Sequence, residues 1–358
     1  MAEIAVTDAR ALFTKGLIQV YQERIYPTQF LRSFFPAVTE PTKELSIEVE
    51  RMGEKVAVDV VRGTEGQRNS FYRSTEKVFL PPLYREYFDA TELDLYDRVL
   101  GSQGNAQAPM FAALMNKVAD KIGLLRDKIE RAYELQCSQV FFNNGIVVVR
   151  SGTNIDFKRK ATSIVDLSAN KWSTGATNPF NQFETGCLFL RQVGRSADSV
   201  FNAICAGDAL AALLANTTFT TRQNLFNMAL DQVHGPQRNA VGATYHGTVT
   251  AGSFKVQLWA YPQFYDLKSG TDAAPVFTST PYIPSGQVTL IPERPNFKFG
   301  FAAVPQLVGE PGQLPVQGEF VMGQFLDTRN AKHDFDIQSA GLAIPVAVDQ
   351  IYTMKNLV

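Results

Sequence analysis

The 358-residue sequence contains few of the residues that usually carry redox, metal or acid–base chemistry. Three cysteines and three histidines are present, at Cys137, Cys187, Cys205, His234, His246 and His333. Cysteines so few and so widely spaced exclude a disulfide framework and the zinc sites of familiar spacing. We therefore expect three reduced thiols in a cytosolic product, without a catalytic role.

The chain also lacks an excess of either charge. Lysine and arginine total 34 and aspartate and glutamate 35, which gives a formal net charge of -1. A protein that binds nucleic acid tightly through its phosphates shows a basic surplus on at least one segment. The nearest basic run, residues 158–160, predicts only a solvated strand end. The 26 Phe and 12 Tyr therefore indicate packing rather than stacking on bases.

Long apolar runs are absent as well. The first twenty residues carry charges at Glu3, Asp8, Arg10 and Lys15 with no apolar core between them, which excludes an ordinary secretory signal peptide. No stretch approaches the roughly 18 apolar residues of a membrane span. We expect no contact with a membrane.

Motifs of catalysis are missing from the sequence. It contains no H-E-x-x-H, no Walker A loop, no G-x-S-x-G and no G-x-G-x-x-G. Residues 101–104 (Gly-Ser-Gln-Gly) offer an anion site before a helix, and residues 333–336 (His-Asp-Phe-Asp) offer a metal site. A helix-entry loop and an alternating edge strand explain these two segments better, and Glu92, Asp94 and Asp97 fit a solvated face. We expect no catalytic residue, no metal and no cofactor.

The strongest structural signal lies at residues 106–142. Apolar side chains recur there at steps of three to five residues, at Met110, Leu114, Val118, Ile122, Leu125, Ile129, Ala132, Leu135 and Val140. This spacing predicts one helix of about 37 residues, about 55 Å long, where the average helix has about 11 residues. A coiled-coil seam is the alternative, but the stripe is not a strict heptad.

The other patterns are short strands and helices. Alternating residues at 45–49 and 56–60 predict a β-hairpin with a turn near Gly53, followed by a polar, glycine-bearing projecting loop over 61–77. Short strands are expected at 146–149 and 155–157. Residues 179–215 predict two helices, 181–193 and 207–214, separated by an exposed turn, and residues from 240 onward predict short strands. The fold class is therefore α+β.

Residues 1–40 do not have the pattern of a self-contained domain. Phe30, Leu31, Phe34 and Phe35 follow one another closely there and need a surface to bury against. Either they contact another subunit or the arm folds back on its own core. We take these four as inter-subunit contacts, together with four residues of the projecting loop: Arg62, Arg68, Phe71 and Tyr72.

The order of these elements resembles the major capsid proteins of tailed phages with the Hong Kong 97-type fold, and more narrowly the lambda-type capsid protein E family. Short segments spread over nearly the whole chain carry the resemblance: 30–36 (Phe-Leu-Arg-Ser-Phe-Phe-Pro), 79–82 (Phe-Leu-Pro-Pro), 155–157, 172–173, 178–180, 259–261, 282–286 and 339–346. Each segment alone is weak, whereas their order and spacing together are specific.

The resemblance implies a division into five parts: an N-terminal arm at 1–40, an extended β-hairpin loop with flanking strands at 41–92, a peripheral domain at 93–180 with the spine helix at 106–142, an axial domain at 181–335, and a C-terminal strand at 336–358 that returns to the peripheral domain. Some members cross-link a Lys to an Asn of a neighbouring subunit. Lys55 and Lys77 are present, but no such pair is identified and we predict none.

As function, the resemblance implies a major capsid protein that is not an enzyme. Such a protein self-assembles into hexamers and pentamers of an icosahedral virion shell, which encloses double-stranded DNA without sequence-specific binding. Assembly takes place in the host cytoplasm, with decoration and portal proteins as possible partners and any scaffold expected as a separate chain. The alternatives are an encapsulin-like nanocompartment subunit, an enzyme or ligand-binding α+β protein, and a tail component.

Overall fold

The computed structural model describes eleven stretches of the chain: residues 26–49, 75–89, 107–143, 145–147, 154–174, 177–225, 237–238, 242–271, 274–307, 313–327 and 332–358. The loop residues Arg62, Arg68, Phe71 and Tyr72 lie outside them, as do residues 101–104 and Glu92, Asp94 and Asp97.

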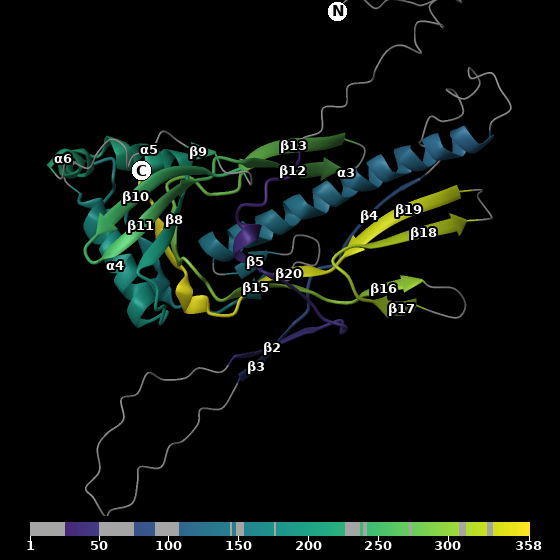
Figure 1. Ribbon diagram of the computed structural model, residues 1–358, viewed down its shortest axis with the longest axis horizontal. Coiled ribbons are helices and arrows are strands. Elements are labelled where there is room, and N and C mark those ends of the chain that lie inside the picture. Colours follow the sequence, from purple (N-terminus) through teal and green to yellow (C-terminus); the bar gives the residue numbers. More distant parts are fainter. Residues whose placement is uncertain are drawn as a thin grey trace, which may run out of the picture.

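The long helix is confirmed as α3 (Gln107–Phe142), 36 residues. It runs between two groups of elements, with α4, β8 and β11 at its C-terminal end and β4, β18 and β19 near its other end (Figure 1). Ile129, Tyr133, Val140 and Phe141 on one face are each 2% exposed or less. Because these residues recur at helical spacing, α3 buries a continuous stripe along its C-terminal half.

A seven-stranded sheet forms the first group, in the order β7-β21-β14-β8-β11-β10-β9. Its strands are β7 (Ile164–Asp166), β21 (Tyr352–Lys355), β14 (Val288–Pro292), β8 (Val200–Cys205), β11 (Phe254–Ala260), β10 (Thr244–Ala251) and β9 (Gln237–Arg238). Helices α4 (Pro179–Gln192), α5 (Gly207–Ala215) and α6 (Thr217–Leu225) lie at the same end of the molecule (Figure 1). The N-cap of α4 is Asn178, which accepts a hydrogen bond from Phe180 N, and proline follows it at the first helical position.

The exposed turn expected between the two helices is wrong. That segment contains β8, the middle strand of the sheet, and five of its six residues are buried. β8 pairs in parallel with β11 and antiparallel with β14, both distant in sequence. A strand covered on both faces shows no alternation, so the local pattern did not reveal it.

Two three-stranded sheets flank α3. One has the order β18 (Val321–Asp327), β19 (Lys332–Ser339), β4 (Tyr84–Asp89), and the other β1 (Ala37–Thr39), β15 (Phe297–Phe301), β20 (Gly341–Pro345). β19 is therefore a middle strand rather than the expected edge strand. Its Asp336 is 1% exposed and is paired with Arg85 at 2.8 Å, so this carboxylate neutralises a cation.

Four two-stranded ribbons complete the described fold: β12 (Phe264–Thr271) with β13 (Ala274–Pro281), β16 (Val304–Leu307) with β17 (Gln313–Val316), β2 (Leu45–Val49) with β3 (Thr75–Phe79), and β5 (Gly145–Val147) with β6 (Asn154–Asp156). The last ribbon is the strand pair predicted after the long helix. β2 was expected to pair with residues 56–60, which lie outside the described residues; its described partner is β3, with Leu45 opposite Phe79.

The C-terminal segment packs against two parts of the molecule, whereas the prediction named only the peripheral domain. β20 packs along α3. β21 enters the seven-stranded sheet between β14 and β7. One continuous hydrophobic core links the N-terminal segment, α3 and the sheets.

Candidate functional site

A buried polar site lies at the junction between the N-terminal segment and α3. Glu134, on the buried face of α3, accepts hydrogen bonds from Leu31 N at 2.8 Å and Arg32 N at 2.9 Å. These amides begin the short 3-10 helix η2 (Arg32–Phe34), which has no capping side chain of its own. The carboxylate thus satisfies backbone donors that a local cap normally satisfies.

Glu134 is completely buried, and burial raises the pKa of its carboxyl to about 7. The two amide hydrogen bonds act in the opposite direction, because they favour the charged form. Removal from water is the larger effect.

Aromatic contacts also hold this N-terminal segment. Phe35 stacks on Phe297, with centroids 5.1 Å apart and planes at 23°. Phe30 lies 5.5 Å from both Trp259 and Tyr261. Aromatic pairs of this kind each contribute roughly 0.5–1.5 kcal/mol beyond their burial, so the segment is fixed by packing as well as by hydrogen bonds.

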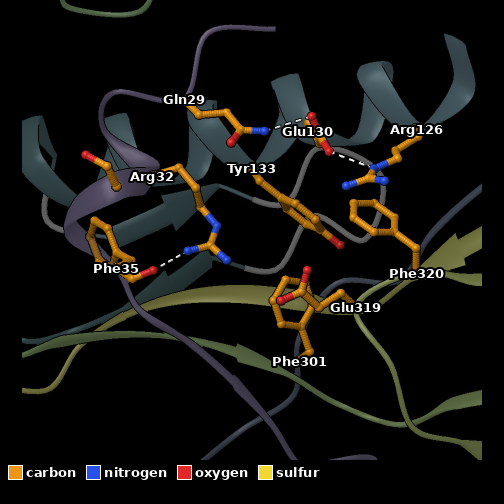
Figure 2. A pocket seen from close by; sticks show the side chains of 10 residues that line it. Gln29, Arg32, Phe35, Arg126, Glu130, Tyr133, Phe301, Glu319 and Phe320 are labelled. Atoms are coloured by element: carbon orange, nitrogen blue, oxygen red, sulfur yellow. Dashed lines mark hydrogen bonds and ion pairs between the residues drawn. The ribbon is translucent and has the colours of Figure 1, made fainter. Parts of the chain in front are cut away.

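A cleft of about 320 Å³ opens beside η2, between α3 and the strands behind it (Figure 2). The Arg32 guanidinium lies over the ring of Phe299 at 3.9 Å and donates to Phe35 O. Arg126 lies over Phe320 at 4.8 Å and pairs with Glu130 at 2.8 Å. The two guanidinium groups are therefore engaged with aromatic rings, with a backbone carbonyl and with a carboxylate.

A second polar centre lies at the C-terminal end of α3. Arg159 is 7% exposed, and its guanidinium donates to five acceptors: Phe141 O at 3.1 Å, Asn143 O at 2.9 Å, Ser163 O at 3.4 Å, Ile351 O at 3.3 Å and Thr353 Oγ1 at 3.0 Å. The solvated strand end expected at 158–160 is therefore wrong for this residue. The last carbonyl groups of a helix have no hydrogen-bond partner within the helix. Arg159 donates to such carbonyls at the end of α3 and also to Thr353 of β21.

Three of the predicted contact residues lie in the chain's own core. Phe30 is 2% exposed, Leu31 0% and Phe35 1%, and Phe34 is half-buried. Phe30, Leu31 and Phe35 therefore pack on the chain's own core, which is the alternative weighed for this part of the arm. Their proximity in sequence signalled burial but not the surface against which they are buried.

Two clusters of exposed apolar residues were not singled out from the sequence. The first, on the β12–β13 ribbon, comprises Phe264, Leu267, Val276 and Phe277. The second, at the corner between β3 and β4, comprises Val78, Leu80 and Leu83. Apolar residues in strands normally indicate core positions, so no sequence signal distinguished these from buried ones.

The described residues hold no other recognisable chemistry. No group of three or more His, Cys, Asp or Glu side chains is placed to hold a metal ion among them. Cys137, Cys187 and Cys205 are unpaired and buried, and burial raises the pKa of the Cys187 and Cys205 thiols to about 12. Among the helices described, none is long and apolar enough to cross a membrane.

The architecture identifies the class of protein. A solved structure described as a prophage capsid protein of E. coli CFT073 matches with a TM-score of 0.58 at 14% identity, covering 97% of this chain and 98% of that chain. The long helix, the arm anchored on it and the two flanking groups of strands make this the Hong Kong 97-type coat-protein fold. A family model described as phage major capsid protein E matches residues 14–356. The chain belongs to the phage major capsid protein E family.

Other solved structures are similar at lower scores. A phage-related protein of Bordetella bronchiseptica RB50 matches with a TM-score of 0.47 at 13% identity, covering 97% of this chain and 96% of that chain. An encapsulin complex from Synechococcus elongatus PCC 7942 matches with a TM-score of 0.45 at 14% identity, covering 99% and 96%. No curated protein shows significant sequence similarity. The family assignment rests on the match over residues 14–356.

Proposed function

We propose that this chain is the subunit of an icosahedral phage head, which assembles with copies of itself into hexamers and pentamers around double-stranded DNA. Membership of the major capsid protein E family is the observation that carries the proposal. Two exposed apolar clusters on separate elements support it, because a subunit of a closed shell needs more than one contact surface. The near-neutral charge agrees with DNA held by confinement rather than by tight binding.

In this proposal the five parts of the chain have separate roles. Residues 1–40 reach a neighbouring subunit through the part before residue 26, and residues 41–92 form the extended loop across an adjacent subunit. Residues 93–180, with α3, form the peripheral domain, and 181–335 form the axial domain around the symmetry centres. The C-terminal residues 336–358 connect the two, since β20 packs along α3 and β21 enters the seven-stranded sheet.

The proposal extends to partners and place of action. The subunits assemble in the host cytoplasm and end in the virion, with a portal protein at one vertex and any scaffold as a separate chain. The same proposal includes a decoration protein that binds the outer surface of the shell. The subunit acts as structural material and not as an enzyme.

Negative-stain electron microscopy of the purified chain tests the proposal directly. The chain is expressed alone and then together with the genes that neighbour its own. We expect closed shells, aberrant shells or rings of five and six subunits. A monodisperse monomer under both conditions would contradict the proposal. Nuclease-protected DNA inside the particles is expected, whereas a protein cargo would indicate an encapsulin-like compartment.

A further inference from the structure

The β12–β13 ribbon presents apolar side chains to solvent on both of its faces. Phe264 is 61% exposed, Leu267 44%, Val276 57% and Phe277 64%. In the antiparallel register Phe277 is opposite Lys268, and directly opposite residues lie on the same face of the ribbon. Alternate residues of a strand also share a face, so Phe264 and Lys268 lie on one face. Phe264 and Phe277 are therefore on the same face. A two-stranded ribbon has no second layer of its own that would cover these side chains.

The base of the same ribbon is held rigidly. Tyr265 packs against Tyr282 with centroids 5.0 Å apart, and Tyr282 is only 4% exposed. The carbonyl oxygen of Tyr282 accepts a hydrogen bond from Ser138 on α3. The exposed side chains are therefore presented by an element anchored in the core, and little ordering remains to be done when a partner binds them.

The second apolar cluster lies at the corner between β3 and β4. Val78 is 54% exposed, Leu80 58% and Leu83 49%. Phe79, between the first two, points inward and contacts Phe157 with centroids 5.6 Å apart. This alternation fixes Val78 and Leu80 on the outer side, so the corner is a second preformed apolar surface.

The two clusters lie on opposite sides of the long helix. In Figure 1 the β12–β13 ribbon is above α3, and the β2–β3 ribbon that leads into the corner is below it. Two different patches on opposite sides of one chain are what a head-to-tail contact between copies needs, because each copy then offers one patch to each neighbour. A symmetric dimer would instead bring one patch against itself.

We propose that the β12–β13 ribbon of one subunit docks on the β3–β4 corner of a second copy of this chain. The proposal rests on the proposed function as a self-assembling subunit and names the surfaces used. A second copy is the occupant because both patches are apolar and because copies surround every subunit of a shell. Repeated around an axis, such a heterologous contact closes into a ring.

Site-directed cross-linking tests the pairing of the two surfaces. The variants Phe277→Cys and Leu80→Cys are made on separate chains, mixed before assembly and oxidised. Both positions are exposed, whereas the native cysteines are buried and give little background. We expect a cross-linked dimer in the mixture and only monomers in either variant alone.

Three outcomes of the cross-linking experiment would contradict the pairing of the two surfaces. Particles without a cross-link overturn the pairing and leave the proposed function in place. A dimer of Phe277→Cys alone indicates a symmetric contact and also overturns it. Absence of any particle from the unsubstituted chain overturns the proposed function and the pairing together.

A loss-of-contact variant gives a second readout. The double variant Phe264→Ser and Phe277→Ser is expected to lower particle yield by at least about tenfold, with an unchanged melting temperature of the monomer. The control Leu188→Ser, an equally polar change at an exposed position of α4, is expected to leave the yield unchanged. Wild-type yield from the double variant contradicts the proposal.

Discussion

Single buried ionisable residues fasten distant parts of this chain to each other. Glu134 accepts from the amides of Leu31 and Arg32. Arg159 donates to a carbonyl at the end of α3 and to Ile351 O, just before β21. A buried charge is tolerated only when several hydrogen bonds compensate for its lost hydration. Glu134 and Arg159 both bond to backbone groups of distant segments, so each one specifies where a terminal segment of the chain lies.

The Glu134 carboxyl predicts a dependence of stability on pH. Its ordinary pKa is 4.5 and burial raises it to about 7 in the folded chain. A carboxyl with a raised folded pKa contributes stability that is complete below the ordinary pKa and is lost as the pH rises through the folded one. Between pH 4.5 and pH 7 this contribution falls by roughly 3 kcal/mol, since one pKa unit corresponds to about 1.4 kcal/mol.

The variant Glu134→Gln is expected to remove that dependence. Its free energy of unfolding, measured with urea at pH 5 and pH 8, should change less between the two values than that of the wild type. The matched control is Glu130→Gln, one turn earlier on α3, which should keep the wild-type difference. An unaltered difference in Glu134→Gln would show that another group is responsible.

Arg159 gives the larger expected loss of stability. The variant Arg159→Met leaves buried carbonyls of Phe141 and Ile351 without this donor, and such a change costs about 3–5 kcal/mol in the free energy of unfolding. Lys158→Met is the control, because its side chain is 81% exposed and should change stability by no more than about 0.5 kcal/mol. Equal effects of the two variants would contradict the role given to Arg159.

Among the elements, α4 approaches the seven-stranded sheet more closely than a larger residue would allow. A Cβ atom added at Gly186 would lie 2.5 Å from Leu290 Cδ1 and 2.8 Å from Tyr352 Cδ1. Both neighbours are buried, at 0% and 5% exposure, so neither has space to move aside. The absence of a side chain at Gly186 therefore sets the distance between helix and sheet.

The variant Gly186→Ala is expected to destabilise the fold by about 1–3 kcal/mol, despite the better helix propensity of alanine. Thermal unfolding of the monomer measures it. Gly207→Ala in α5 is the matched control, because its nearest neighbour would be Pro262 Cβ at 3.8 Å, an ordinary contact. The control should be neutral or slightly stabilising, and a similar loss in both would contradict the packing argument.

At the scale of the whole molecule, the N-terminal segment has a folding part and, in our proposal, an assembly part. Residues Phe30, Leu31 and Phe35 belong to the core of the chain. Residues before 26 are assigned to contact with a neighbour only in the proposed function. The two parts are separated by a few residues, so truncation can distinguish them.

A chain that begins at residue 26 is expected to fold with a melting temperature close to that of the full chain but to assemble poorly. A chain that begins at residue 36 loses the aromatic contacts and the partners of Glu134, and it should lose several kcal/mol of stability, since each large buried side chain contributes roughly 1.5–3 kcal/mol. Calorimetry measures the stability of both truncated chains, and electron microscopy shows whether they assemble into shells. Normal shells from the chain beginning at residue 26 would contradict the assembly role.

The sequence by itself determined the elements whose signals are local. The period of apolar residues predicted α3 to within one residue, and the helix expected at 207–214 is α5. The strand pair after α3 was predicted from a short apolar run and a turn. Resemblance in the order of such elements also indicated the family. These signals depend only on residues a few positions apart, so the sequence displays them directly.

Only the tertiary structure decided which distant segments meet. It made β8 a middle strand, gave β2 its partner β3, and divided the C-terminal segment between α3 and the seven-stranded sheet. It also buried Arg159 and Glu134, whose partners lie up to 194 positions away. Whether a polar side chain is buried depends on the backbone groups that arrive from elsewhere. No periodicity within the segment itself records them, which is why charge alone suggested solvent at Arg159.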